Sequence, residues 1–153
     1  MLWFDNQAEE AAKFYCSIFK NSKITAVAHY GDTGPGPEGS VMTCAFQLDG
    51  QEFVALNGGP IFKFTEAVSF VVNCDNQAEI DTYWDKLRAG GQPSQCGWLK
   101  DKYGLSWQIV PKILSELVSA KDPVRGNRVM AELMKMTKLD IATLQKAYDG
   151  PSS

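Results

Sequence analysis

The chain has 153 residues, a net charge of −3 and a hydrophobic share of 44 %. This length suits one domain of ordinary size with a real core, and this share of apolar residues excludes an intrinsically disordered chain. The slightly acidic balance, without any basic run, argues against a nucleic-acid-binding protein, and no apolar stretch reaches the ~20 residues of a membrane-spanning helix. We therefore expect a cytoplasmic protein without a signal peptide, and with neither nucleic acid nor membrane as its partner.

The four cysteines lie far apart in the sequence, at Cys16, Cys44, Cys74 and Cys96. Structural zinc sites use closely spaced ligand pairs, which this sequence lacks. Isolated thiols of a cytoplasmic domain are usually reduced and buried. The cysteines are therefore predicted to be structural thiols, with no redox or metal-binding role.

The first predicted elements are a short strand at residues 2–4 and a helix capped by Asp5 or Asn6. The apolar positions of this helix have the spacing of one helical face and are Ala11, Phe14, Tyr15 and Ile18. Strands follow at residues 23–30, 40–48 and 51–56, the last two joined by the hairpin dipeptide Asp49-Gly50. Glycine and proline make residues 31–39 a loop.

The run Asp5–Glu9 (Asp-Asn-Gln-Ala-Glu) returns unchanged at Asp75–Glu79. A second similarity links Gly50–Leu56 with Gly104–Val110, each a strand pattern after a turn glycine. Repeats of this kind indicate a duplicated supersecondary module. The chain is therefore predicted to contain two copies of one module, the second shortened, followed by a tail.

The second copy opens with a strand at residues 67–73, and Asp75 is its predicted helix cap. Its helical stripe consists of Ile80, Tyr83, Trp84 and Leu87. Residues 92–97 are predicted as a loop, and a hairpin joins strands at 98–102 and 105–110.

The tail from Pro111 onward has a helical pattern, with Asp122 and Asp140 as predicted caps. Its apolar face consists of Val129, Met130, Leu133, Met134 and Met136. This face has two possible uses: it packs within its own subunit, or it contacts a second copy of the chain.

Several motifs along the chain together match a known family. They are Leu2-Trp3-Phe4-Asp5, Ala8-Glu9-Glu10-Ala11, Phe46-Gln47-Leu48-Asp49-Gly50, Ala55-Leu56-Asn57-Gly58-Gly59-Pro60 and Cys96-Gly97-Trp98-Leu99-Lys100-Asp101. With these motifs the chain resembles the PhnB-like branch of the vicinal oxygen chelate superfamily, which includes glyoxalase I, extradiol dioxygenases and bleomycin-binding proteins. Members of this branch often carry the label 3-demethylubiquinone-9 3-methyltransferase.

The resemblance implies an α+β fold in which two tandem βαβββ modules form a concave mixed sheet, followed by C-terminal helices. The first module is expected at residues 1–58, a linker at 59–66, the second module at 67–110 and the helical tail at 111–153, within one compact domain overall. Relatives pair into dimers, so a homodimer is expected.

In metal-dependent relatives, each module supplies one ligand from its first strand and one carboxylate from its last, and the divalent ion they hold acts as a Lewis acid. By resemblance, the corresponding positions here are Gln108, Val54 or Leu56, Ser69 or Phe70, and a fourth at or just before Met1. An amide is a weak metal ligand, and an aliphatic side chain is none. We therefore expect no bound metal and no cofactor, while residues before Met1 remain a possible source of one ligand.

Without a metal, such a fold still offers a cleft that binds small molecules through apolar walls and a few polar anchors. The candidate ligand-binding residues are Gln108, Asn57, Lys63, Trp98, Trp107 and Phe46, with Gln95 and Lys100 as further anchors. Gln108 is the most specific of these, since the resemblance places it where a metal-binding carboxylate would point. The alternative role of the aromatic residues is core packing. The alternative for Lys63 is that of a charged side chain on the solvated surface.

The predicted function is the binding of an unidentified small molecule, with an uncharacterised lyase-, isomerase- or dioxygenase-like activity in the same cleft as the alternative. Methyl transfer from S-adenosylmethionine, which the family label suggests, is disfavoured. It usually uses a Gly-rich strand-to-helix turn in an alternating α/β pattern. Here Gly34-Pro35-Gly36 precedes a predicted strand.

Overall fold

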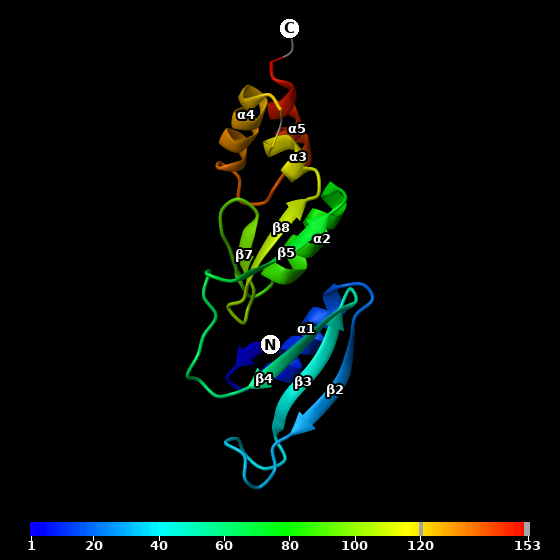
Figure 1. The fold of residues 1–153 in the computed structure, drawn as a ribbon, viewed down its shortest axis with the longest axis vertical. Helices are drawn as coiled ribbons and strands as arrows, with labels where there is room; N and C mark the ends of the chain where they lie inside the picture. Colours follow the sequence, from blue (N-terminus) through cyan, green and yellow to red (C-terminus); the bar gives the residue numbers. More distant parts are fainter. Residues whose placement is uncertain (120, 152–153) are drawn as a thin grey trace. The chain divides into compact units, whose positions relative to one another are not determined.

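The computed structural model describes residues 1–119 and 121–151. The chain divides into two compact units, Met1–Phe64 and Thr65–Ser153, which we call the first and the second unit. The boundary between them lies inside the segment predicted as a linker, residues 59–66. In the described part of the chain, each unit contains one mixed sheet (Figure 1).

The first unit has the predicted βαβββ order. Its elements are β1 (Leu2–Phe4), α1 (Ala8–Ile18), β2 (Lys23–His29), β3 (Val41–Leu48) and β4 (Gln51–Asn57). The sheet order is β1-β4-β3-β2, with β1 parallel to β4 and the other neighbours antiparallel. Asp49 and Gly50 both have positive φ, as a tight hairpin turn requires, so the predicted β3–β4 hairpin is confirmed.

The start of α1 depends on a residue far along the chain. The helix begins after Gln7 without the predicted cap from residues 5–6. Instead, the Asn57 side chain accepts a hydrogen bond from the Ala8 amide at 2.8 Å and donates one to the Val41 carbonyl at 3.0 Å. The predicted cap was wrong because the acceptor comes from the end of β4, and one amide group thereby joins α1, β3 and β4.

The second unit repeats the module in a shorter form. Its elements are β5 (Ser69–Cys74), α2 (Gln77–Arg88), β6 (Gln92–Pro93), β7 (Trp98–Lys100) and β8 (Ser106–Pro111). The sheet order is β5-β8-β7-β6, with β5 parallel to β8. The predicted α+β class with two tandem βαβββ modules is therefore confirmed. The loop prediction was wrong for β6, since a two-residue strand is too short to show a period.

The cap of α2 lies one residue later than predicted. The Asn76 side chain accepts from the Glu79 amide at 3.0 Å, while the Glu79 carboxylate accepts from the Asp75 amide at 2.8 Å. This arrangement is similar to a capping box, except that the Glu79 carboxylate accepts from the residue before the cap. Asp75 thus takes part through its backbone, and its carboxylate forms an ion pair with Lys112 at 2.5 Å.

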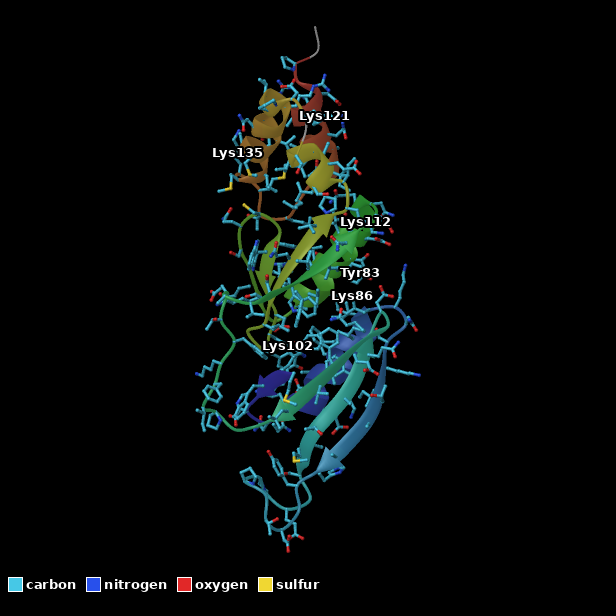
Figure 2. The ribbon with its side chains drawn as sticks, viewed as in Figure 1. Tyr83, Lys86, Lys102, Lys112, Lys121 and Lys135 are labelled. Atoms are coloured by element: carbon cyan, nitrogen blue, oxygen red, sulfur yellow. The ribbon has the colours of Figure 1, made fainter. Side chains whose placement is uncertain are left out.

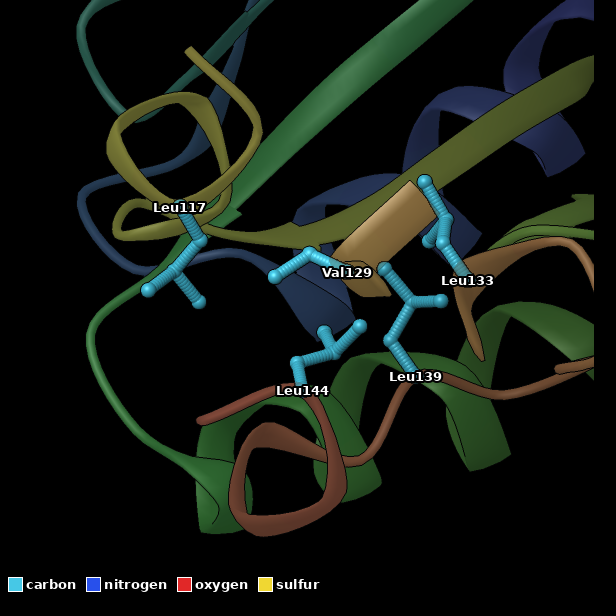
Figure 3. Packing of buried hydrophobic residues seen from close by; sticks show 5 residues of the cluster. All are labelled: Leu117, Val129, Leu133, Leu139 and Leu144. Carbon is cyan, nitrogen blue, oxygen red and sulfur yellow. The ribbon is translucent and has the colours of Figure 1, made fainter. Parts of the chain in front are cut away.

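The tail forms α3 (Leu114–Val118), α4 (Pro123–Leu133) and α5 (Ile141–Asp149). The predicted caps are confirmed: Asp122 accepts from the Val124 amide at 2.9 Å, and Asp140 accepts from the Thr143 amide at 2.7 Å. These helices enclose a buried cluster of Leu117, Val129, Leu133, Leu139 and Leu144 (Figure 3).

The predicted apolar face of the tail is divided between core and surface. Val129 and Leu133 belong to the buried cluster, whereas Met130 and Met134 are exposed. Cys96 and Val110, from the module that precedes the tail, pack against the same cluster. The tail is therefore part of the second unit's core.

Candidate functional site

The sheet of the second unit has one covered and one open face. α2 packs against β7 and β8 on the covered face, which buries Val72, Leu99, Trp107 and Ile109. Successive side chains of a strand point to opposite faces. We call the other side the open face; it carries Ser69, Val71, Trp98, Lys100, Ser106 and Gln108.

The strand register arranges the open face in two rows. The polar row runs across β7, β8 and β5 through Lys100, Ser106 and Ser69. The mixed row beside it runs through Trp98, Gln108 and Val71. In Figure 2, Lys102 marks the β7–β8 turn next to the polar row, and Lys112 marks the far end of β8. The open face thus places charged and hydroxyl groups beside an aromatic ring and an amide.

Gln108 and Ser69, two of the candidate positions for a metal ligand, are hydrogen-bonded to each other. The Gln108 side chain donates to the Ser69 hydroxyl oxygen at 3.0 Å, and both residues are half-buried. A neutral amide and a neutral hydroxyl are weak ligands for a divalent ion. In the first unit, Val54 and Leu56 on β4 are aliphatic. These side chains do not fit the divalent ion of the metal-dependent relatives.

The remaining described residues do not supply a substitute cluster. Among residues 1–119 and 121–151, no group of three or more His, Cys, Asp or Glu side chains is arranged to hold a metal ion. The cysteines in this part of the chain are free thiols. Burial raises the pKa of the Cys74 thiol to about 11, so this group is protonated at neutral pH and is a poor metal ligand or nucleophile.

A cavity of about 140 Å³ lies against the polar row. Lys100, Ser106, Trp98 and Glu66 are among the residues that line it. The Lys100 ammonium forms an ion pair with the Glu66 carboxylate at 2.5 Å. The hydrogen bond from Lys100 lowers the pKa of the Glu66 carboxyl, so Glu66 is ionised at neutral pH.

Ser106 is the unusual member of this cavity. The residue is only 1 % exposed, and its hydroxyl has no hydrogen-bond partner in the part of the chain that the structure describes. A buried hydroxyl without a partner costs about 1–3 kcal/mol, so native proteins rarely keep one without a reason. Ser106 therefore places a buried hydroxyl, without a partner among the described residues, beside the cavity.

Two of the predicted ligand-binding aromatics lie in the cores. Trp107 is on the covered face, where its indole N–H donates to the buried Asp101 carboxylate at 2.9 Å. Phe46 is buried in the first unit and stacks on Phe53 with 5.4 Å between ring centroids. Of the predicted residues, Trp98 and Gln108 are brought together directly, as a cross-strand pair on the open face.

Of the other predicted anchors, Asn57 and Lys63 lie in the first unit. Asn57 uses its side-chain amide to join α1, β3 and β4, as described above. Lys63 is exposed on the segment after β4. The exposed Gln95 belongs to the second unit, in the segment between β6 and β7.

The first unit also contains a larger cavity, of about 670 Å³, beside the start of α1. Asp5, Glu9, Lys13, Tyr30 and Asn57 are among its lining residues. Several of its polar groups are engaged with one another: the Tyr30 hydroxyl donates to the Asn57 backbone carbonyl at 2.5 Å, and Lys13 pairs with Glu9 at 2.7 Å. We therefore regard the smaller cavity, with its unpartnered hydroxyl, as the better candidate site.

The sequence prediction did not include Ser106 and Glu66. Ser106 could have been found, because it precedes Gln108 by two residues on the same strand and therefore shares its face. Glu66 lies in the irregular segment before β5, where no periodicity predicts a position.

Comparison with known proteins places the chain in a family. A family model described as 3-demethylubiquinone-9 3-methyltransferase matches residues 1–110. The chain belongs to this family. A PhnB protein from Bacillus cereus is similar to it in structure, with a TM-score of 0.66 and 40 % sequence identity over 72 % of this chain and 95 % of that one. The predicted PhnB-like character within the vicinal oxygen chelate superfamily is confirmed.

Two more distant solved structures share the fold. Protein PA1353 from Pseudomonas aeruginosa has a TM-score of 0.60 at 20 % identity, over 72 % of this chain and 92 % of that one. A glyoxylase/bleomycin resistance protein/dioxygenase domain from Frankia has a TM-score of 0.51 at 16 % identity, over 72 % and 86 %. None of the curated proteins compared with the chain matches it significantly. The family model ends at Val110, so α3, α4 and α5 lie beyond it.

The helices also bear on the membrane prediction. Among the helices of residues 1–119 and 121–151, none combines the length and the apolar character that a bilayer crossing needs.

Proposed function

We propose that the protein binds a small organic molecule on the open face of the second unit, without a metal ion. The observation that carries this proposal is the meeting of an aromatic ring, an amide and a polar cavity on one sheet face: Trp98, Gln108 and the cavity beside Ser106. Sites for small molecules combine an apolar surface with a few fixed polar groups in this way.

The open face has the rigidity that such a site needs. Its residues lie on hydrogen-bonded strands rather than on loops, and the Gln108–Ser69 hydrogen bond fixes the orientation of the amide. Side chains held in place before binding lose little conformational entropy when a ligand arrives.

An enzymatic role in the same cavity is the alternative. Its support is the Lys100–Glu66 ion pair, which puts a possible acid and a possible base beside the cavity. However, the lowered pKa of Glu66 makes this carboxylate a weak base at neutral pH. The pair therefore favours binding over proton transfer.

Methyl transfer, which the family description names, has less support. The connections from β1 to α1 and from β5 to α2 contain no glycine, so neither forms the Gly-rich turn typical of dinucleotide-type cofactor sites. Gly34 and Gly36 pack against the Tyr30 ring in the loop before β3, where an added Cβ atom would clash with the ring. These glycines have a packing role.

The test is a fragment screen on the ¹⁵N-labelled full chain, followed by amide chemical shifts. We expect some fragments to shift the amides of Trp98, Ser106 and Gln108, and Trp98→Leu to weaken their binding. Phe62→Leu is the matched control, because it removes an exposed aromatic ring from the first unit. Fragments that shift only residues outside the open face, or none at all, would refute the proposal.

We also propose that the protein is a homodimer and is located in the cytoplasm. The exposed Met130 and Met134 on and after α4 offer apolar surface for pairing. Light scattering of the purified chain tests the first point: twice the mass of one chain supports it, and the mass of one chain contradicts it.

A further inference from the structure

We propose that the small molecule carries a carboxylate group, which binds between Lys100 and Ser106 and replaces Glu66 on the Lys100 ammonium. This inference rests on the proposed function, because it specifies what the open face binds. Three observations support it: the unpartnered hydroxyl of Ser106, the geometry of the Lys100–Ser106 pair, and the exposure of Glu66.

Ser106 provides the first observation. The residue lines the cavity, and its hydroxyl is buried and has no hydrogen-bond partner within the described residues. A ligand oxygen would satisfy this group, and an ionised oxygen would do so best, since hydrogen bonds to charged acceptors are roughly twice as strong as neutral ones.

Lys100 provides the second observation. It lies directly opposite Ser106 on the neighbouring strand, so both side chains project from the same face of the sheet. Side chains in such a cross-strand pair are about 5 Å apart at their Cβ atoms, which lets one carboxylate contact both. An ammonium and a hydroxyl side by side are the donors that a carboxylate requires.

Glu66 provides the third observation, because its carboxylate already forms an ion pair with the Lys100 ammonium. Its side chain is 64 % exposed, while that of Lys100 is 37 % exposed. Ion pairs with one solvent-exposed partner contribute little, so this contact can be exchanged at low cost. In the structure, Glu66 contacts Lys100 at 2.5 Å and leaves the Ser106 hydroxyl without a partner. A ligand carboxylate that reaches both groups gains the bond that Glu66 does not make.

The dimensions of the site restrict the ligand further. The cavity of about 140 Å³ equals about five water molecules at ~30 Å³ each, which is room for a carboxylate and little more. The rest of the ligand must then lie over the mixed row, where Trp98 offers a ring face and Gln108 an amide. We therefore expect a carboxylate attached to a flat or apolar body.

The experiment compares benzoate with benzamide, which have the same shape and differ in charge. Each is titrated into the ¹⁵N-labelled full chain at constant ionic strength, with sodium chloride as the blank, and the amides of Lys100, Ser106 and Trp98 are followed. Benzoate is expected to bind about tenfold more tightly than benzamide, the typical gain of a charge-assisted hydrogen bond.

Variants of the cavity should change benzoate affinity in opposite directions. Lys100→Met is expected to weaken it about tenfold and Ser106→Ala roughly threefold, whereas Glu66→Gln removes the competing carboxylate and should strengthen it roughly threefold. Lys102→Met is the matched control: it removes the same charge from the β7–β8 turn and should leave affinity unchanged. Amide spectra of all variants establish that they are folded.

The outcomes separate this inference from the proposed function. Equal binding of benzoate and benzamide at Trp98, or benzoate affinity that is unchanged in Lys100→Met and Glu66→Gln, overturns the carboxylate inference and leaves the binding site in place. No shift of the Lys100 and Ser106 amides by benzoate, even in Glu66→Gln, overturns it as well. If the fragment screen also leaves the open face unperturbed, both proposals fail.

Discussion

Replacing Ser106 by alanine is expected to stabilise the second unit, although Ser106 is one of its most buried residues. Its unpartnered hydroxyl costs about 1–3 kcal/mol in the folded state. Alanine removes this hydroxyl and keeps the Cβ atom, so the loss of packing is small. We expect the free energy of unfolding to rise by about 1 kcal/mol, which for a domain of this size raises the melting temperature by roughly 4–8 °C.

Ser69→Ala is the matched control on the neighbouring strand. The Ser69 hydroxyl accepts a hydrogen bond from Gln108 at 3.0 Å. Replacing Ser69 by alanine therefore removes an existing hydrogen bond. A typical bond of this kind contributes about 1 kcal/mol, so the control should lower stability by that amount. The two variants differ from the wild type by one oxygen atom each and should change stability in opposite directions.

Urea unfolding combined with amide hydrogen exchange in β8 measures both effects. Hydrogen exchange reports the opening of this strand specifically, which matters because the chain has two compact units. The reasoning would be refuted if Ser106→Ala lowered the stability of β8 by 1 kcal/mol or more. The hydroxyl would then be satisfied in the free protein and would not be available to a ligand.

Three further predictions concern the tail and the thiols. Leu144→Ala should lower the free energy of unfolding of the second unit by about 2–5 kcal/mol in urea titrations, because Leu144 is fully buried in the tail cluster. Asp140→Ala should cost about 1 kcal/mol through loss of the α5 cap. Hydrogen bonds from Thr143 lower the pKa of the Asp140 carboxyl, so this contribution is present at neutral pH and is lost as the pH falls below the ordinary value of 3.8. A thiol reagent at pH 8 should label the half-buried Cys96 before the buried Cys74, whose pKa is about 11, when labelling is followed by mass spectrometry.

Each of these has a control. Met134→Ala changes a side chain that is 63 % exposed and should have little effect on stability; an equal loss in Leu144→Ala and Met134→Ala would contradict the buried cluster. An Asp140→Ala variant with the same acid stability as the wild type would argue against the cap. Unfolding in urea should abolish the difference between Cys96 and Cys74, and rapid labelling of Cys74 in the native protein would mean that β5 opens readily.

The modular fold could be predicted from the sequence because its main signals are local. The repeated Asp-Asn-Gln-Ala-Glu run marks the same strand-to-helix connection in both units, and the Asp49-Gly50 turn determines a hairpin register within a few residues. Asp122 and Asp140 were recognisable caps because no competing cap residue adjoins them. Such features depend on a few neighbouring residues only.

Features that depend on distant contacts could not be predicted. The acceptor at the start of α1 is Asn57, 49 residues further along the chain. At α2, two adjacent residues, Asp75 and Asn76, are both good caps, and the structure shows Asn76 in that role. The partition of the tail, with Met134 exposed and Val129 buried, depends on how α4 meets its neighbours.

The candidate site was predictable in part. Trp107 and Gln108 are adjacent on one strand, so their side chains point to opposite faces of the sheet. A pocket on one face can therefore be lined by only one of the two. The same alternation places Ser106 on the same face of the sheet as Gln108. The missing hydrogen bond of the Ser106 hydroxyl and the approach of Glu66 to Lys100 could not be predicted, because both depend on the three-dimensional positions of segments without a sequence period.

The most direct test of the central claim is a titration of the best-binding fragment with and without EDTA, and then with added Mn²⁺, Ni²⁺, Zn²⁺ or Fe²⁺, while the amides of Trp98, Ser106 and Gln108 are observed. The account predicts that the fragment shifts these amides with the same affinity in every condition. An affinity that disappears in EDTA and returns with one of the ions, but not in Gln108→Ala, would contradict it and would indicate a chelating site on this face.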